Sequence, residues 1–352
     1  MTAAHERIVR VIGSLLQSEE SQQLLLEECS QKEGDEYFWL NPFQSKSNWV
    51  DIGGVRITCE HPIPQPERIP FKVPYPGTVC DYDSSELRSH LRWMMQKELL
   101  HQDMFLIGPP GPYRRWIAFM FCEFIRRPAS YISLTRDTSE SDLKQRREIK
   151  NSSAVYEDLL VVEAATKGHV LIIEGIEKCE RNVLPVLNNL LENREMLLED
   201  GRFLVNHNRY DQLLKESGQT KEYLQKLNLI RAHPNFRVIA LGLPVPQFPG
   251  NPMDPPLRSR FQCRDVIPAS IETHLKVLPK GILPKYRTEE NISLMKQLIS
   301  FSDTLQRLGN EEEQQLLPHF PDTPGILRAL QILTTFPGTS FEISTSECFS
   351  FS

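Results

Sequence analysis

The sequence predicts an α/β fold in which helices cover both faces of a parallel sheet, and three observations support this prediction. Short apolar runs, such as Val170 to Ile173, are continuous rather than alternating with polar residues. These runs alternate along the chain with segments of helical periodicity, and no strand pattern occurs beyond Val266. Continuous apolar strands alternating with helices are typical of a parallel sheet buried on both faces. The remainder after Val266 predicts a small helical second domain.

The predicted elements follow one another in a regular order. The first confident helix begins near Asp83, which is a suitable N-cap because Glu86 follows three residues later, as in a capping box. After it come a strand in "DMFLIG", a Gly/Pro loop and a helix in "WIAFMFCEFIRR". A strand at "SYISL" follows, with a polar loop, a helix through "DLKQRREI" and a further helix through "YEDLLVVEAATKG". The last elements are a strand in "HVLIIEG", a helix in "NVLPVLNNLLENRE", a hairpin turning at Asp200-Gly201, and a strand in "FRVIALG".

These elements divide the chain into five parts. We expect an N-terminal extension over 1–50, a strand with a proline-rich linker over 51–79, a core over 80–266 that carries a helical insertion near 206–228, a helical domain over 267–336, and a tail over 337–352. The strand of the second part is expected at 55–59. The proline-rich run after it cannot continue a helix, which indicates an extended connection.

Composition and charge exclude several classes of function. The chain has 352 residues, a formal net charge of -6, and acidic and basic residues that are mixed along its length. Because no basic region stands out, the sequence argues against a nucleic-acid partner. No apolar run approaches the length that a membrane-spanning helix needs.

The cysteines and the N-terminus indicate an intracellular protein. The seven cysteines show neither CxxC nor mixed Cys/His ligand spacing, so they predict neither a disulfide framework nor a zinc site. The N-terminal segment has helical periodicity and carries Glu6, Glu19 and Glu20, unlike an acid-poor mitochondrial transit peptide.

The stretch "FLIGPPGPYRRW" resembles a phosphate-binding loop in its order of elements but not in its side chains. Such loops follow G-x-x-x-x-G-K-[ST], where backbone N–H groups and the lysine hold phosphates and the hydroxyl holds magnesium. Here Tyr113 stands at the second glycine, Arg114 at the lysine and Arg115 at the hydroxyl. The candidate nucleotide-binding residues are Gly108, Pro109, Pro110, Gly111, Pro112, Tyr113, Arg114 and Arg115. An anion site and an ordinary strand-to-helix turn remain alternatives.

The strand in "LIIEGIEK" is the candidate for the acidic strand of a nucleotide-hydrolysing site. Such a strand ends in two acids, one for magnesium and one that orients the attacking water. Glu174 occupies the first place, which makes it the candidate metal-binding and catalytic acid, but Gly175 occupies the second. Glu177 lies close by, and we expect it to be an acid at a helix start or on the surface. The water-positioning place at the end of "VIALGLP" holds Gly242 or Leu243, so we expect that role to be unfilled as well.

An arginine pair ends the predicted core. In "PPLRSRFQ", Arg258 and Arg260 lie where an arginine can reach the phosphates bound by a neighbouring subunit in a ring. We expect Arg260 to act as such an arginine finger. The alternative is a solvated or salt-bridged pair.

The ordered set "FLIGPPG", "TSESDL", "LIIEGIEK", "LENREMLLEDGRFL", "VIALGLPVP" and "DPPLRSRF" resembles the dynein-related, MoxR-like branch of the AAA+ ATPases. The resemblance covers about residues 51 to 336 and implies a P-loop NTPase core, a three-layer sandwich, followed by a helical lid. It also implies ATP and Mg²⁺ as cofactors, partners in a homo- or hetero-oligomeric ring or further AAA modules, remodelling of a partner protein, and a mitochondrial location.

Two classes of function therefore remain. The first is an ATP-binding module that remodels proteins, with intrinsic hydrolysis weakened by the residues at Arg115, Gly175 and Leu243. The second is a ring subunit or scaffold that does not hydrolyse ATP. Both classes share the fold and the position of the nucleotide.

Overall fold

The computed structural model of the chain describes residues 49–59, 65–70, 85–150, 152–217 and 220–266, with isolated positions between 288 and 300. The extension expected over 1–50 lies outside the described residues except at its last two positions. Most of the proline-rich linker, the N-cap at Asp83, almost all of the helical domain and the whole tail also lie outside them.

The core of the described residues is a five-stranded sheet in which every neighbouring pair of strands is parallel. Its spatial order is β12-β3-β11-β7-β4, so β3, the first of these strands in the chain, lies between the last two. Because all five strands run in one direction, their carboxyl ends share one edge of the sheet. The strands are β3 (Asp103–Ile107), β4 (Ala129–Ser133), β7 (Val170–Glu174), β11 (Arg237–Gly242) and β12 (Phe261–Asp265).

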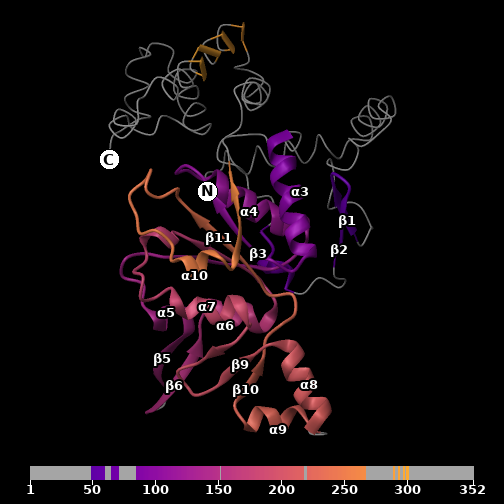
Figure 1. Ribbon diagram of the computed structural model, residues 1–352, viewed down its shortest axis with the longest axis vertical. Coiled ribbons are helices and arrows are strands. Elements are labelled where there is room, and N and C mark those ends of the chain that lie inside the picture. Colours follow the sequence, from indigo (N-terminus) through magenta and orange to yellow (C-terminus); the bar gives the residue numbers. More distant parts are fainter. Residues whose placement is uncertain are drawn as a thin grey trace. The chain divides into compact units, whose positions relative to one another are not determined.

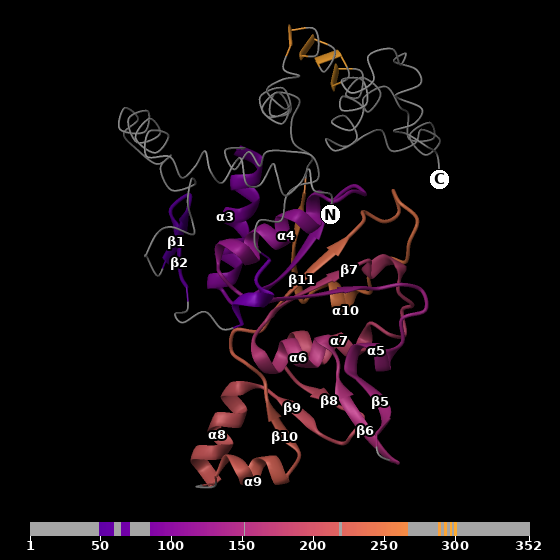
Figure 2. The same cartoon turned by 180° about the vertical axis from the view of Figure 1, so that it is seen from behind.

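Helices cover both faces of this sheet, which confirms the predicted three-layer α/β fold (Figures 1 and 2). On one face, α6 (Leu160–Lys167) and α7 (Pro185–Glu192) share a buried apolar cluster with β3, β7 and β11. On the other, α3 (Ser85–Leu99) contacts β3, and α4 (Tyr113–Phe124) contacts β7 and β11. In β7, residues 170–173 are all fully buried. Each contributes roughly 1.5–3 kcal/mol of apolar burial, which explains why this run is continuous.

A buried ion pair ties the end of α7 to the edge of the sheet opposite the phosphate-loop position. Arg194 Nη1 lies 2.8 Å from Asp103 Oδ2, and Asp103 is only 3% exposed. The other oxygen of Asp103 accepts a hydrogen bond of 2.8 Å from the backbone N–H of Val238. Burial raises the pKa of Asp103, while Arg194 and the Val238 amide act in the opposite direction.

A β-hairpin precedes the core, whereas the sequence predicted only its second strand. β1 (Trp49–Ile52) pairs antiparallel with β2 (Val55–Thr58), and both strands contact α3. The turn consists of Gly53 and Gly54, both with positive φ, which is the backbone that a two-residue hairpin turn requires. The short helix η2 (Pro66–Arg68) follows, and its Arg68 forms a bidentate ion pair with Glu163 on α6.

A second hairpin interrupts a region that the sequence predicted to be helical, so that prediction was wrong. α5 (Glu140–Lys144) stops where Gln145 adopts an extended conformation, and β5 (Gln145–Lys150) then pairs with β6 (Ser153–Asp158). The following helix, α6, therefore starts at Leu160 rather than near Tyr156. The hairpin projects from the fold, and its Ile149 is 81% exposed.

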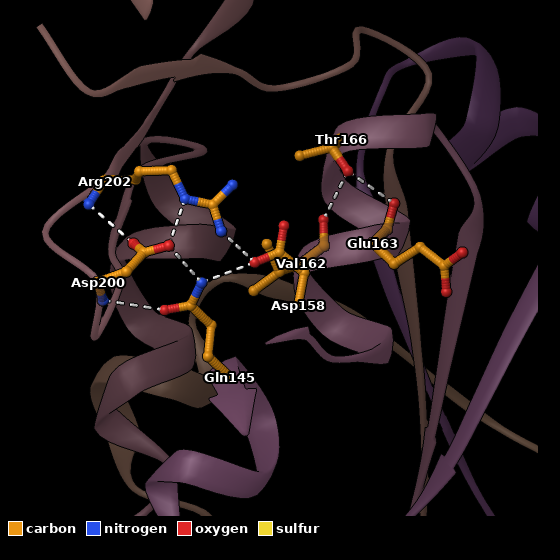
Figure 3. Close-up of polar contacts among 7 residues, drawn as sticks. All are labelled: Gln145, Asp158, Val162, Glu163, Thr166, Asp200 and Arg202. Carbon is orange, nitrogen blue, oxygen red and sulfur yellow. Dashed lines mark hydrogen bonds and ion pairs between the residues drawn. The ribbon is translucent and has the colours of Figure 1, made fainter. Parts of the chain in front are cut away.

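A polar cluster joins the base of this hairpin to the segment that contains Asp200 and Arg202 (Figure 3). The Gln145 Nε2 group donates to Asp158 Oδ1 at 2.7 Å and to Asp200 Oδ2 at 2.9 Å. Arg202 pairs with both carboxylates. Gln145 is almost fully buried, so these contacts satisfy a polar group that would otherwise be costly to bury.

The region after α7 contains a small three-stranded sheet and two helices. β8 (Met196–Leu197) pairs antiparallel with β9 (Phe203–Val205), and Gly201 has a φ of 83°, which confirms the predicted turn at Asp200-Gly201. The helices α8 (His207–Ser217) and α9 (Lys221–Lys226) occupy the expected insertion. β10, whose residues are 229–231, then pairs parallel with β9, a pairing that the sequence did not indicate.

Among the described residues, every helix is too short or too polar to cross a bilayer.

Candidate nucleotide site

The loop after β3 has the predicted strand–loop–helix order. α4 begins at Tyr113 with Pro112 as its N-cap, and Gly111 has a φ of 137°. A side chain at Gly108 would lie 2.7 Å from the backbone oxygen of Val266, so only glycine fits there. The backbone N–H of Gly108 is turned toward Gly242 at the end of β11, at 3.3 Å from its oxygen.

The loop can offer fewer backbone amides to an anion than a standard phosphate loop. Pro109, Pro110 and Pro112 have no N–H, which leaves the amides of Gly111 and of the first turn of α4. First-turn amides lack partners within the helix and carry its positive end. At the second glycine position, Tyr113 stacks on Trp116, with ring centroids 5.9 Å apart. Burial raises the pKa of Tyr113, which therefore stays neutral.

Arg114, at the lysine position, is a buried cation. Its side chain is only 6% exposed, and its Nη1 group donates to the backbone oxygen of Gly242. Its Nε group is buried and has no hydrogen-bond partner within the part of the chain that the structure describes. Burial lowers the pKa of Arg114, while the nearby charges of Glu177 and Glu174 raise it. Because a guanidinium stays protonated in proteins, α4 starts with a positive charge that has unused donors.

Arg115, at the hydroxyl position, forms an ion pair with the acid of the acidic strand. Its Nε lies 2.6 Å from Glu174 Oε2, and the Tyr131 hydroxyl donates to the same oxygen. The guanidinium also lies over the Tyr131 ring, 5.4 Å from its centroid. Burial would raise the pKa of Glu174, but the hydrogen bonds from Arg115 and Tyr131 together lower it. Glu174 is therefore a carboxylate that is already paired.

Gly175, at the place of the second acid, has a backbone that excludes a side chain. It lies in the left-handed region, with φ 83° and ψ 33°. A Cβ there would be 2.8 Å from the backbone oxygen of Leu134, closer than side chains normally approach. Because a residue other than glycine is strained in this conformation, a glutamate at this place would need the backbone to move.

Glu177 is buried at the site, which corrects the expectation of a surface acid. It lies in the first turn of the short helix η3 (Ile176–Lys178), which agrees with the expected alternative of an acid at a helix start. Its side chain is 6% exposed, and its Oε2 lies 3.4 Å from the backbone N–H of Leu243. The absence of a side chain at Gly250 makes room for Glu177, because a Cβ there would lie 2.8 Å from the Glu177 Cβ. Sequence spacing gave no signal of this contact.

The end of β11 holds no polar side chain that could position water. A Cβ at Gly242 would lie 2.7 Å from the Phe105 ring, so packing keeps this position bare. Leu243 contributes its backbone N–H to Glu177 rather than to a ligand.

Arg260 lies away from these contacts, next to α10 (Pro255–Arg258). Its guanidinium pairs with Glu192 at the end of α7 and donates to the backbone oxygen of Pro256. Its Nε is buried, with no hydrogen-bond partner among the residues that the structure describes. The structure thus brings Arg114, Arg115 and Glu174 together at the carboxyl edge of the sheet and ties Arg260 back to α7.

The donor set fits a phosphate group better than a divalent metal. For a phosphate, the site offers the amides of Gly111 and of the first turn of α4, the exposed guanidinium of Arg115, and the orphaned Nε of Arg114. For magnesium, no hydroxyl follows the lysine position, and Glu174 already accepts two hydrogen bonds. Within the described ranges, no group of three or more His, Cys, Asp and Glu side chains could hold a metal ion.

The chain resembles several known proteins along part of its length. It is 50% identical over 295 residues to von Willebrand factor A domain-containing protein 8 of Mus musculus, a match that covers 83% of this chain and 14% of the mouse protein. The chain therefore spans about one seventh of that relative. It is 22% identical over 247 residues to an uncharacterized protein of Staphylococcus aureus, covering 68% of this chain and 80% of the other.

A solved structure from Cytophaga hutchinsonii, described as a "putative ATPase", aligns with a TM-score of 0.36 and 12% identity over 71% of this chain and 78% of the other. Likeness at this level says nothing about individual residues. Residues 103–261 match the AAA domain family of the dynein-related subfamily, and this match contains β3, β4, β7 and β11 and ends at the first residue of β12. The chain therefore carries an ATPase-type AAA domain of the dynein-related subfamily, a domain that implies nucleotide binding.

Proposed function

We propose that this chain is an ATP-binding AAA module whose own hydrolysis is weak or absent. The observation that carries the proposal is the backbone at Gly175, which has a left-handed φ of 83° and no room for a side chain beside the Leu134 oxygen. The position of the water-orienting acid therefore has no carboxylate, and it has no space for the side chain that would bear one. The phosphate-binding side of the site retains its glycine, its helix and two arginines.

In this proposal, Arg114 and Arg115 bind the outer phosphates and the α4 amides bind the phosphates nearest the loop. Arg114 is positioned for this role because its unused Nε faces no competing partner, although its Nη1 group must leave the Gly242 oxygen. Arg115 can keep its Nε on Glu174 and offer its two Nη groups to the ligand. Binding therefore costs the contact of Arg114 with Gly242, and we expect affinity in the micromolar range rather than tighter.

The wider role that we propose is remodelling of a partner protein within a ring or a multi-module assembly. The dynein-related AAA family and the likeness to one seventh of the mouse relative support this role. In an assembly, Arg260 would leave Glu192 and reach the nucleotide of the next subunit. An intracellular, mitochondrial location is proposed from that likeness alone.

The competing proposal is a non-hydrolysing scaffold, and the Arg115–Glu174 pair favours it. A module that hydrolyses ATP would need Glu174 to release Arg115 and to hold Mg²⁺ through water. If the pair stays closed, the nucleotide is structural and the chain serves as an interaction subunit.

One experiment compares these proposals. Binding of labelled ATP and release of phosphate are measured for the full chain, for Arg114→Ala and for Glu174→Ala, with Arg147→Ala, an exposed hairpin arginine, as the control. Binding without release, weakened by Arg114→Ala but not by Arg147→Ala, supports the non-hydrolysing scaffold. Phosphate release that Glu174→Ala abolishes would favour hydrolysis. No binding at all would defeat both proposals.

A further inference from the structure

Arg115 is the residue that differs most from its counterpart in a metal-dependent phosphate loop. In a phosphate loop, the side chain at this position is a hydroxyl that holds magnesium together with the acid of the neighbouring strand. In this chain a guanidinium stands there and reaches that same acid, with 2.6 Å between Arg115 Nε and Glu174 Oε2. A fixed cation therefore occupies the side of the site where the metal would be held.

The rest of the Arg115 guanidinium is available to a ligand. Only its Nε is engaged in a hydrogen bond, and the side chain is 45% exposed. Among the described residues, its two Nη groups have no hydrogen-bond partner. A guanidinium carries a planar fork of donors that matches the oxygens of a phosphate, so one edge can remain near Glu174 while the other binds the ligand.

A divalent cation would meet unfavourable surroundings at the same place. Arg115 and Arg114 are both positive, and the charges of Glu174 and Glu177 already act on Arg114. Magnesium favours oxygen ligands in octahedral geometry, but Glu174 already accepts hydrogen bonds from Arg115 and Tyr131, and the Glu177 carboxylate is turned to the backbone N–H of Leu243. The arginines thus supply the charge that the metal would otherwise supply.

We infer that Arg115 takes the place of the magnesium ion, so that this site binds the polyphosphate of a nucleotide without a divalent metal. This inference rests on the proposed ATP binding. Arg115 neutralises the outer phosphates from the side of Glu174, and Arg114 does so from the interior of the site. The Tyr131 ring lies beneath the Arg115 guanidinium, and the Tyr131 hydroxyl donates to Glu174, the acid that pairs with Arg115.

The test is calorimetric titration of the full chain with ATP, once with EDTA and once with excess Mg²⁺. The expected result is a dissociation constant in EDTA that is equal to the value in Mg²⁺ within about threefold, or lower. A tenfold or larger loss of affinity in EDTA would overturn the inference and leave the proposed ATP binding intact. An absence of binding in both conditions would overturn both.

Two substitutions test whether Arg115 is the group responsible. Arg115→Thr restores the hydroxyl and frees Glu174, so affinity in EDTA should fall at least tenfold and added Mg²⁺ should recover part of it. Glu174→Gln keeps the shape of the side chain but releases Arg115, so affinity in EDTA should rise about threefold or more. Arg147→Ala is the control and should change neither value. If Arg115→Thr remains folded and binds as the parent does in EDTA, or if Glu174→Gln weakens that binding, the inference is wrong.

Discussion

Replacing Gly175 with alanine tests whether the backbone itself excludes a catalytic side chain. Gly175 has a φ of 83°, and an added Cβ would lie 2.8 Å from the Leu134 oxygen. A residue other than glycine in such a conformation costs roughly 1–3 kcal/mol. For a domain of this size, that loss lowers the unfolding temperature by roughly 2–12 °C. The close contact adds to the strain, because the backbone of Leu134 must also move.

Gly201 provides a matched control for this prediction. Its φ is also 83°, but an added Cβ would meet nothing within 4 Å. Thermal or denaturant unfolding of Gly175→Ala, Gly201→Ala and the parent separates the cost of φ from the cost of the contact. We expect Gly175→Ala to be the less stable variant, and Gly175→Glu to be destabilised without gaining phosphate release. Equal stability of the two alanine variants, or hydrolysis gained by Gly175→Glu at parental stability, would refute the reasoning.

Three further predictions follow from contacts outside Gly175. Arg115→Ala should lower the free energy of unfolding by up to about 1 kcal/mol at pH 7, because the Arg115–Glu174 pair is partly exposed. Since Arg115 lowers the pKa of Glu174 in the folded protein, this loss should be present above the ordinary carboxyl pKa and should disappear as the pH falls through the lowered pKa. Denaturant unfolding of both proteins between pH 7 and 3 measures it. Arg194→Met should cost about 3–5 kcal/mol in the free energy of unfolding, because it leaves the carboxylate of Asp103 buried without its cation. Gln145→Ala should cost about 1–3 kcal/mol and raise amide exchange in β5 and β6, because it removes the hydrogen bonds that the buried Gln145 amide makes to the carboxylates of Asp158 and Asp200.

Each of these predictions has a contradicting outcome. A pH-independent difference for Arg115→Ala would mean that the ion pair is absent in solution. An Arg194→Met variant as stable as the parent would show that Asp103 finds another partner or becomes neutral. Unchanged exchange in the hairpin after Gln145→Ala would place its anchoring elsewhere.

The fold class and the position of the loop were predictable because they depend on local patterns. The run at 170–173 is fully buried and therefore apolar at every position, which distinguishes a two-sided strand from an alternating one. The turn at Asp200-Gly201 was predictable because Gly201 needs a positive φ. In each case the structural position demands a particular residue type, so the residue itself indicates the structure.

The hairpin of β5 and β6 was not predictable in this way, because charged residues fit a surface helix as well as an exposed strand. Its strands are fixed by Gln145, whose partner Asp200 is distant in the sequence. The burial of Glu177 and the pair of Arg115 with Glu174 also depend on contacts between separate elements. Spacing along the chain does not encode which of two acids turns inward, so the charge arrangement of the site required the structure.

The site is expected to bind ATP and to hydrolyse it slowly or not at all. The chemical state of the bound nucleotide tests this expectation: the full chain is incubated with ATP and Mg²⁺ or EDTA, separated from free nucleotide, denatured and analysed by chromatography over several hours. We expect the bound nucleotide to be recovered as ATP in both conditions. Recovery as ADP, at a rate that Glu174→Ala abolishes, would contradict it.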